Sequence, residues 1–197
     1  MQLIKPLFTA LLATMIALNT LADTQDIHGI KVEDSSQVAG TALALNGAGT
    51  RYKAIFKVYV AALYLGKKAS TPDDVVNQTG PKRLSVTMLR DIDAAELGKL
   101  LTRGMEDNMG RAAMSALVPG LVRMGQIFSD QKKMLAGDTF LIDWVPGKGT
   151  VITVKGVAQG EAFKEPEFFA ALMSVWLGPS PADHKLKEAL LGANNAR

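Results

Sequence analysis

The stretch LNGAGTRYKAIFKVYVAALYL, Leu45 to Leu65, joins a glycine-rich segment that carries Arg51 to the most apolar strand predicted for this chain. From Ala54 onward, apolar residues occupy both alternating sets of positions, so we expect a strand that is covered on both faces. A phosphate-binding glycine loop is followed by a helix, whereas a strand follows LNGAGT. We therefore predict a hairpin turn at LNGAGT, with Arg51 where the strand leaves it.

The N-terminus has the pattern of an export signal. Lys5 precedes an apolar core from Leu7 to Leu18, and small residues stand at Thr20 and Ala22, where a signal peptidase reads the chain. The core is shorter than the roughly 20 residues of a membrane span. Cleavage before Asp23 is favoured over an uncleaved anchor, which predicts a signal peptide at 1–22, one domain at 23–197 with no membrane span, and a periplasmic or secreted protein.

Composition excludes several classes of function. The formal net charge is only +3, and the basic residues are scattered without interleaved aromatic residues, which argues against nucleic-acid binding. The chain has no cysteine and two histidines, so the usual histidine metal clusters and Cys/His nucleophile pairs are not available. We expect no metal and no cofactor.

The predicted elements alternate between strands and helices. Strands are expected at 30–32, 37–45, 54–65 and 82–89, and as a hairpin at 138–145 and 150–155 around PGKG. Helices are expected after Thr71, after Asp93, from Leu121 to Phe128, from Pro166 to Leu177, and before Gly192. Pro119-Gly120 is expected to separate the second helix from the third. This order predicts an α+β fold, a mainly antiparallel sheet with helices packed on one side.

Three segments resemble the chalcone isomerase-like family. The opening stretch is similar to the family's signature of a Gly-x-Gly turn, an arginine and a strand that begins Phe-Lys and ends Tyr-Leu. MSVWLGPSPADHKLKEALLG, Met173 to Gly192, resembles its C-terminal helix and the ending after it, and GDTFLIDWVPGKGTVITVKG fits its bacterial exported branch. The resemblance implies an open-faced β-sandwich with a ligand cleft between sheet and helices.

The resemblance also implies site residues. Arg51 matches an arginine of the plant enzymes, which close the ring of a chalcone, while Tyr59 falls on a threonine and Asn108 on an asparagine. Leu101 and Val175 replace a tyrosine and a second threonine of those enzymes, and neither can donate a hydrogen bond. Another branch of the family binds fatty acids, with the matching arginine on the carboxylate, and apolar replacements suit such a cleft.

Three hypotheses about function follow. The first is a non-catalytic envelope protein that binds a small apolar ligand, a fatty acid or a flavonoid-like molecule, through Arg51, Tyr59 and Asn108. The second is a chalcone isomerase-type intramolecular lyase, and the third is an interaction or structural protein without a ligand. Each residue also has a structural interpretation: Arg51 as an exposed strand-end charge, Tyr59 as a core residue, and Asn108 as a partner of backbone groups.

Overall fold

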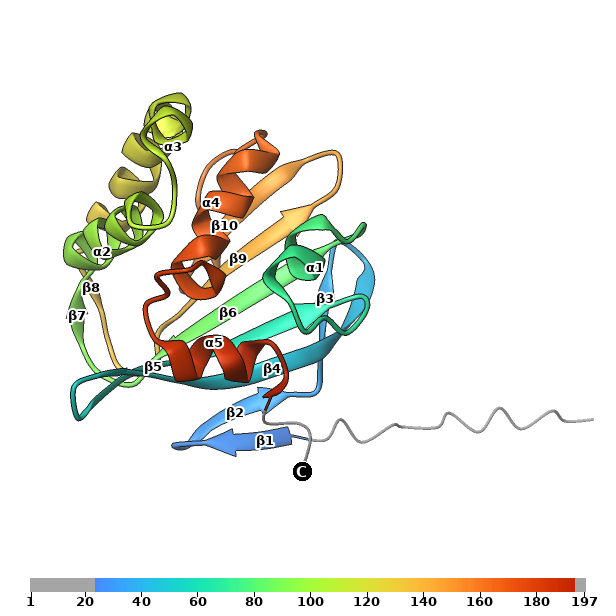
Figure 1. The fold of residues 1–197 in the computed structure, drawn as a ribbon. Coiled ribbons are helices and arrows are strands. Elements are labelled where there is room, and N and C mark those ends of the chain that lie inside the picture. Colours follow the sequence, from blue (N-terminus) through green and yellow to red (C-terminus); the bar gives the residue numbers. More distant parts are fainter. Residues whose placement is uncertain (1–23, 194–197) are drawn as a thin grey trace, which may run out of the picture.

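The computed structural model describes residues 24–193, so the predicted signal peptide lies outside the described residues. Seven strands form one curled sheet in which every neighbouring pair is antiparallel (Figure 1). From one edge to the other they are β11 (Val157–Ala158), β10 (Gly149–Val154), β9 (Thr139–Val145), β6 (Lys82–Met88), β5 (Phe56–Leu65), β4 (Thr41–Lys53) and β3 (Ser35–Val38).

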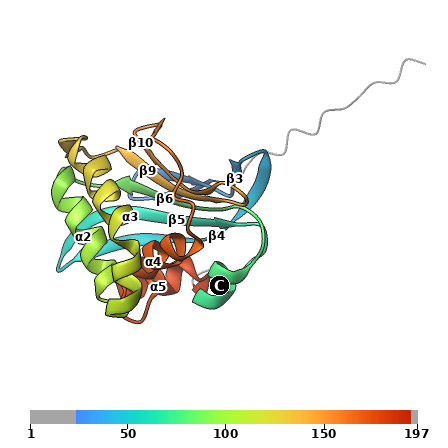
Figure 2. The same ribbon diagram turned by 90° about the horizontal axis from the view of Figure 1, so that it is seen from above.

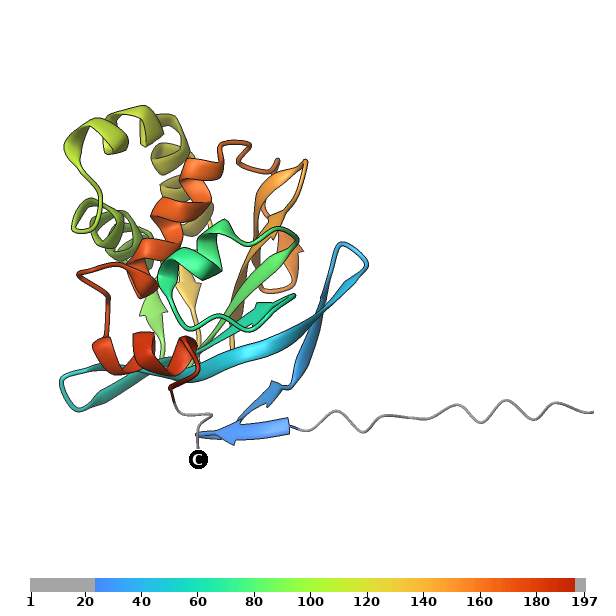
Figure 3. The same cartoon turned by 45° about the vertical axis from the view of Figure 1, so that its right-hand side comes forward.

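The helices pack on one side of this sheet, as Figures 2 and 3 show. They are α1 (Pro72–Asn77), α2 (Ala94–Glu106), α3 (Arg111–Ser129), α4 (Pro166–Leu177) and α5 (His184–Leu190). Two small antiparallel pairs complete the described chain: β1 (Thr24–Ile27) with β2 (Ile30–Glu33), and β7 (Ile92–Asp93) with β8 (Lys133–Met134). The predicted α+β architecture is therefore confirmed.

The helix starts follow the predicted capping residues. Thr71 caps α1, where its hydroxyl accepts a hydrogen bond from the Asp74 amide, and Asp93 caps α2 by accepting one from the Glu96 amide at 2.9 Å. Each cap satisfies a backbone donor that the first helical turn leaves unpaired. Helix α4 spans the predicted residues and stops at Gly178.

Strand β5 separates two apolar clusters. Its odd-numbered residues from Tyr59 to Leu65 belong to the core under the helices, whereas Val60, Ala62 and Tyr64 pack on the opposite face. There they meet Val32, Val38 and Leu43 of β2, β3 and β4. The prediction that this strand is buried on both faces is confirmed from Tyr59 to Leu65, whereas it was wrong for residues 54–57, which are exposed.

The glycine-rich segment is not a turn, and that prediction was wrong. LNGAGT lies inside β4, and the turn comes later at Ala54, which adopts a φ of +54°. The glycines serve helix packing instead. A Cβ at Gly47 would collide with the Ala189 carbonyl oxygen, and one at Gly49 would lie 2.8 Å from the Ala189 Cβ. Helix α5 therefore packs directly on the backbone of β4.

The predicted helix break at Pro119-Gly120 was also wrong. Helix α3 runs through Pro119, and the break between α2 and α3 falls at residues 107–110. Proline removes one helical N–H donor, but the helix is held by packing at this point. A Cβ at Gly120 would lie 2.8 Å from two ring atoms of Phe168 on α4, so the glycine permits close contact between these helices.

Candidate functional site

A cleft of about 420 Å³ lies between the β4–β5 hairpin, helix α2 and the segment that joins α4 to α5. This volume falls in the range of about 300 to 1,000 Å³ that is typical of small-molecule sites. Its apolar lining comprises Val58, Ile92, Leu97, Leu100, Val175, Pro181 and Ala182. Its ionisable lining comprises Arg51, Lys53, Tyr59, Arg90, Arg103, Asp91, Glu96 and Asp107. The cleft thus offers an apolar wall together with several cations.

Sheet register brings Arg51 and Tyr59 together. The two residues are direct partners across β4 and β5, so their side chains project from the same face of the sheet as neighbours. Tyr59 is only 6% exposed, whereas Arg51 is half-buried. Both line the cleft, where the sequence predicted a ligand site.

The Tyr59 hydroxyl is a protonated donor at neutral pH. Burial raises the pKa of Tyr59 to about 12, although a hydrogen bond from Trp176 and the nearby Arg51 guanidinium each lower it in part. The Trp176 indole Nε1–H donates to the Tyr59 oxygen at 2.9 Å. Because that bond uses a lone pair of the hydroxyl oxygen, the phenolic proton itself can be donated to a ligand.

Arg51 forms no ion pair among residues 24–193, although the Asp183 carboxylate is near enough to contribute to the raised pKa of its neighbour Tyr59. The ion pairs in this part of the chain join Arg83 to Asp143 and Lys155 to Asp138. A guanidinium presents a planar fork of donors that matches a carboxylate in geometry. The donors of Arg51 can therefore serve an anion that enters the cleft.

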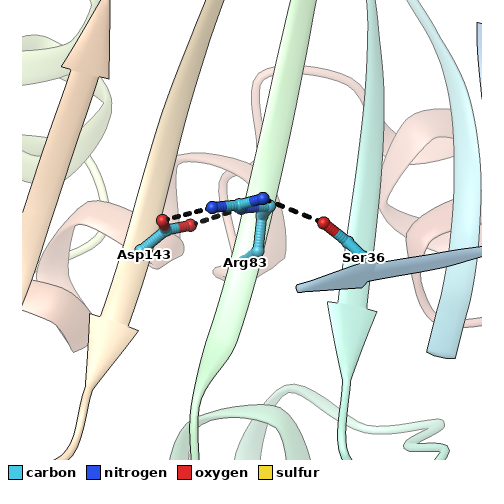
Figure 4. A network of polar contacts seen from close by, with 3 residues as sticks. All are labelled: Ser36, Arg83 and Asp143. Atoms are coloured by element: carbon cyan, nitrogen blue, oxygen red, sulfur yellow. Dashed lines mark hydrogen bonds and ion pairs between the residues drawn. The ribbon is translucent and has the colours of Figure 1, made fainter. Parts of the chain in front are cut away.

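Arg83, in the same sheet, is an arginine whose donors are used by contacts within the fold. Its Nε and Nη2 donate to the two Asp143 oxygens at 2.7 and 2.6 Å, and its Nη1 donates to the Ser36 hydroxyl at 2.9 Å (Figure 4). Asp143 accepts on one side and Ser36 on the other. All three guanidinium nitrogens of Arg83 therefore donate to partners within the fold.

Asn108 supports the wall of the cleft from behind. Its amide nitrogen donates to the carbonyl oxygens of Gly104 and Ser180 at 2.7 and 2.9 Å, and its amide oxygen accepts from the Ser180 N–H at 2.7 Å. Asn108 is not among the residues that line the cleft, whereas Ser180 is. The structure therefore brings Arg51 and Tyr59 together at the cleft and places Asn108 as the residue that holds the 180–182 segment.

The two apolar replacements occupy different places. Val175 lines the cleft, while Leu101 is 3% exposed and belongs to the main core. Met105, Met114 and Met124 are likewise buried in that core.

Several lining residues were missed by sequence reasoning. Leu97, Leu100 and Gly104 lie at helical spacing on α2 and line the cleft as one stripe that Asp107 continues at the C-cap, so periodicity could have identified this face. Arg90 follows β6 without any pattern that marks it.

The described residues hold neither a metal-binding cluster nor a membrane-spanning helix. Residues 24–193 contain no group of three or more His, Cys, Asp or Glu side chains placed to hold a metal ion. No helix in the same range is both long and apolar enough to cross a bilayer.

Comparisons with known proteins agree with this architecture. The family model described as chalcone isomerase-like matches residues 24–192. Among solved structures, the chain is similar to a fatty-acid binding protein of Arabidopsis thaliana, with a TM-score of 0.67, 14% sequence identity, and coverage of 87% of this chain and 97% of that chain. Among curated proteins, none matches this chain.

Proposed function

Because this chain belongs to the chalcone isomerase-like family, we propose that it binds a small apolar carboxylate, such as a fatty acid, without catalysis. The observation that carries the proposal is a half-buried arginine that forms no ion pair in residues 24–193, located beside a protonated phenol in a cleft with an apolar wall. The Arabidopsis thaliana protein with this fold is a fatty-acid binding protein, which supports the same ligand class.

Arg51 and Tyr59 supply the head-group contacts in this proposal. The guanidinium donates two N–H bonds to the carboxylate, and the Tyr59 hydroxyl donates a further bond. Charge-assisted hydrogen bonds of this kind contribute about 1.5 to 3 kcal/mol each. The acyl chain lies against the apolar lining, where each buried methylene contributes about 0.8 kcal/mol.

Ring closure of a chalcone is less well supported by these residues. Leu101 and Val175 stand where the family's catalytic hydroxyls are expected, and a side chain without a donor cannot polarise a ketone. Tyr59 keeps its proton at neutral pH, because its pKa is raised to about 12, and so it does not act as a base there.

We also propose that the protein acts outside the cytoplasm, in the periplasm or as a secreted protein. Support comes from the export-signal pattern at 1–22, which lies outside the described residues. Mass spectrometry of the protein from fractionated bacterial cells tests this. We expect a chain that begins at Asp23 in the periplasmic fraction. A full-length chain in the cytoplasmic fraction would contradict it.

Calorimetric titration of the delipidated protein tests the binding proposal. We expect a long-chain fatty acid to bind better than its methyl ester, which lacks the carboxylate. Arg51→Leu should weaken acid binding by about tenfold to more than a hundredfold and abolish the preference over the ester. Arg111→Leu, at an exposed position on α3, is the matched control and should change nothing.

Two results would overturn the proposal. One is a fatty-acid affinity that is the same in wild type and Arg51→Leu. The other is saturable acceleration of hydroxychalcone ring closure above the spontaneous rate that Arg51→Leu abolishes, because this would establish the lyase instead.

A further inference from the structure

The turn between β4 and β5 exposes apolar side chains to solvent. Ile55 is 84% exposed, Phe56 57% and Tyr52 38%. Residues at such turns are usually Gly, Asn, Asp or Ser, which tolerate the backbone and interact with water. Here Ala54 adopts the left-handed φ of +54°, and Ile55 and Phe56 follow it. The hairpin extends past its neighbours at the left edge of Figures 1 and 3.

Basic residues flank this apolar tip. The segment from 53 to 57, KAIFK, contains Lys53 and Lys57 and no acidic residue. Lys57 Nζ lies 3.1 Å from His28 Nδ1 in the turn between β1 and β2, and the nearest acidic contact is Asp183, which accepts a hydrogen bond from the Tyr52 N–H at 3.0 Å. The Arg90 guanidinium carbon lies 5.4 Å from the centre of the Phe56 ring, so this exposed arginine adds a further charge next to the exposed ring. An apolar tip with a basic collar is complementary to an anionic lipid surface.

The tip stands at the cleft. Lys53 and Val58, from the two strands of the same hairpin, line the cleft, and Leu100 of α2, itself 43% exposed, lines it as well. The acidic lining residues come from elsewhere, Glu96 and Asp107 from α2 and its end, and Asp91 from the segment before β7. The cleft and the basic residues at the tip are therefore adjacent, because Lys53 and Arg90 belong to both.

We propose that this tip, Tyr52 to Lys57, docks the protein on a bilayer that contains anionic phospholipid. Ile55 and Phe56 enter the acyl region, while Lys53, Lys57 and Arg90 contact the phosphate groups. Docking itself is independent of the ligand, but its use in loading the cleft from the membrane rests on the function proposed above. Poorly soluble fatty acids partition into bilayers, so a cleft that meets the membrane obtains its ligand at high local concentration.

Vesicle flotation of the delipidated protein measures the docking. We expect binding to phosphatidylcholine vesicles that contain phosphatidylglycerol, and much weaker binding to phosphatidylcholine alone. Ile55→Ser with Phe56→Ser should weaken binding by about tenfold or more. Lys53→Gln with Lys57→Gln, or a higher salt concentration, should weaken it as well, because salt screens the charges.

Helix α3 offers a matched control. Val118 and Val122 are 51% and 69% exposed, far from the hairpin in sequence, and neither lines the cleft. Val118→Ser with Val122→Ser removes a comparable exposed apolar pair and should leave vesicle binding unchanged. Phe56→Trp gives a direct readout, since an indole that enters the bilayer shifts its fluorescence emission to the blue.

The outcomes separate docking from ligand binding. Neither Ile55 nor Phe56 lines the cleft, so their serine variant should bind soluble fatty acid like wild type. Failure of wild type to float, equal flotation with neutral vesicles, or an equal loss in the α3 control would overturn the docking proposal. So would a wild-type dimer in sedimentation that the serine variant abolishes, because the tip would then contact a second copy of the chain. Loss of fatty-acid affinity in Arg51→Leu without loss of flotation would support both proposals.

Discussion

The sheet contains two arginine–tyrosine pairs whose tyrosines lie on the same strand, β5, but whose arginines have different partners. Arg51 is the register partner of Tyr59, and Arg83 is the register partner of Tyr64, on the other face of β5. Burial raises the pKa of both tyrosines to about 12. In both pairs, an arginine therefore lies across the strand from a buried tyrosine that is protonated at neutral pH.

The partners beyond each pair differ. Arg83 is fixed by Asp143 and Ser36, and the Tyr64 hydroxyl donates to the Glu33 carbonyl oxygen at 3.1 Å. Arg51 forms no ion pair in residues 24–193, and the Tyr59 hydroxyl accepts from Trp176 and keeps its proton for donation. The donors of Arg83 and Tyr64 are used by contacts within the fold, whereas Arg51 and Tyr59 line a cleft. Variants of each pair should separate stability from binding.

The largest effect is expected for Arg83→Met. The variant leaves Asp143, 7% exposed, without its bidentate partner, and an uncompensated buried carboxylate costs about 3 to 5 kcal/mol of unfolding free energy. Urea unfolding measures this loss. Adding Asp143→Leu should restore much of it, and a loss below about 1 kcal/mol in the single variant would show that the pair is not structural.

An intermediate effect is expected at alkaline pH. The folded-state pKa of Tyr59 is raised from 10.0 to about 12, so its contribution to stability is complete below pH 10 and is lost as the pH rises toward 12. A shift of two units corresponds to about 2.7 kcal/mol. Tyr59→Phe should therefore lose less stability than wild type over this interval. Parallel unfolding curves for the two proteins would contradict the assignment.

A smaller effect of opposite sign is expected for Lys82→Met. Lys82 is 2% exposed, and its Nζ lies 5.8 and 5.6 Å from the ring centres of Trp144 and Phe169. Burial lowers the pKa of this amine, which means that the fold disfavours the charge present at neutral pH. We expect a change between zero and about 1 kcal/mol of stabilisation at neutral pH. A clear loss in urea unfolding would assign Lys82 a structural charge interaction instead.

The smallest effect on the empty protein is expected for Arg51→Leu. With no acid to leave unpaired in residues 24–193, its removal should change the free energy of unfolding by less than about 0.5 kcal/mol. Thermal unfolding of the delipidated protein checks this, and added fatty acid should raise the melting temperature of wild type only. A loss of stability as large as that of Arg83→Met would show that Arg51 stabilises the fold and is not held in reserve for a ligand.

Local patterns predicted much of the fold. The hydroxyl and carboxylate caps at Thr71 and Asp93, the two-sided burial of β5, and the bounds of α4 depend on interactions within a few residues, which periodicity and capping rules describe. The two errors, at LNGAGT and at Pro119-Gly120, share a cause. In both places a glycine serves a helix distant in the sequence, and that partner is not visible locally.

The site residues also divide into those that local patterns predicted and those that depend on distant contacts. Arg51 and Tyr59 were predicted as site residues, and the sheet register makes them neighbours at the cleft. The amide of Asn108 is instead directed to Ser180, 72 residues later, a contact that no local pattern specifies. Trp176, which orients the Tyr59 hydroxyl, is 117 residues from its partner and was likewise not predicted as part of the site.

The close packing of α5 on the two glycines of β4 also determines which parts of the chain must meet before the cleft exists. The side-chain amide of Asn46, next to those glycines, donates to the Leu190 carbonyl oxygen across 144 residues. Contacts between residues so far apart in the sequence form slowly, because the entropy of the intervening chain must be lost first. The 180–182 wall of the cleft leads directly into α5. We therefore expect the cleft to be completed late in folding, when α5 docks on β4.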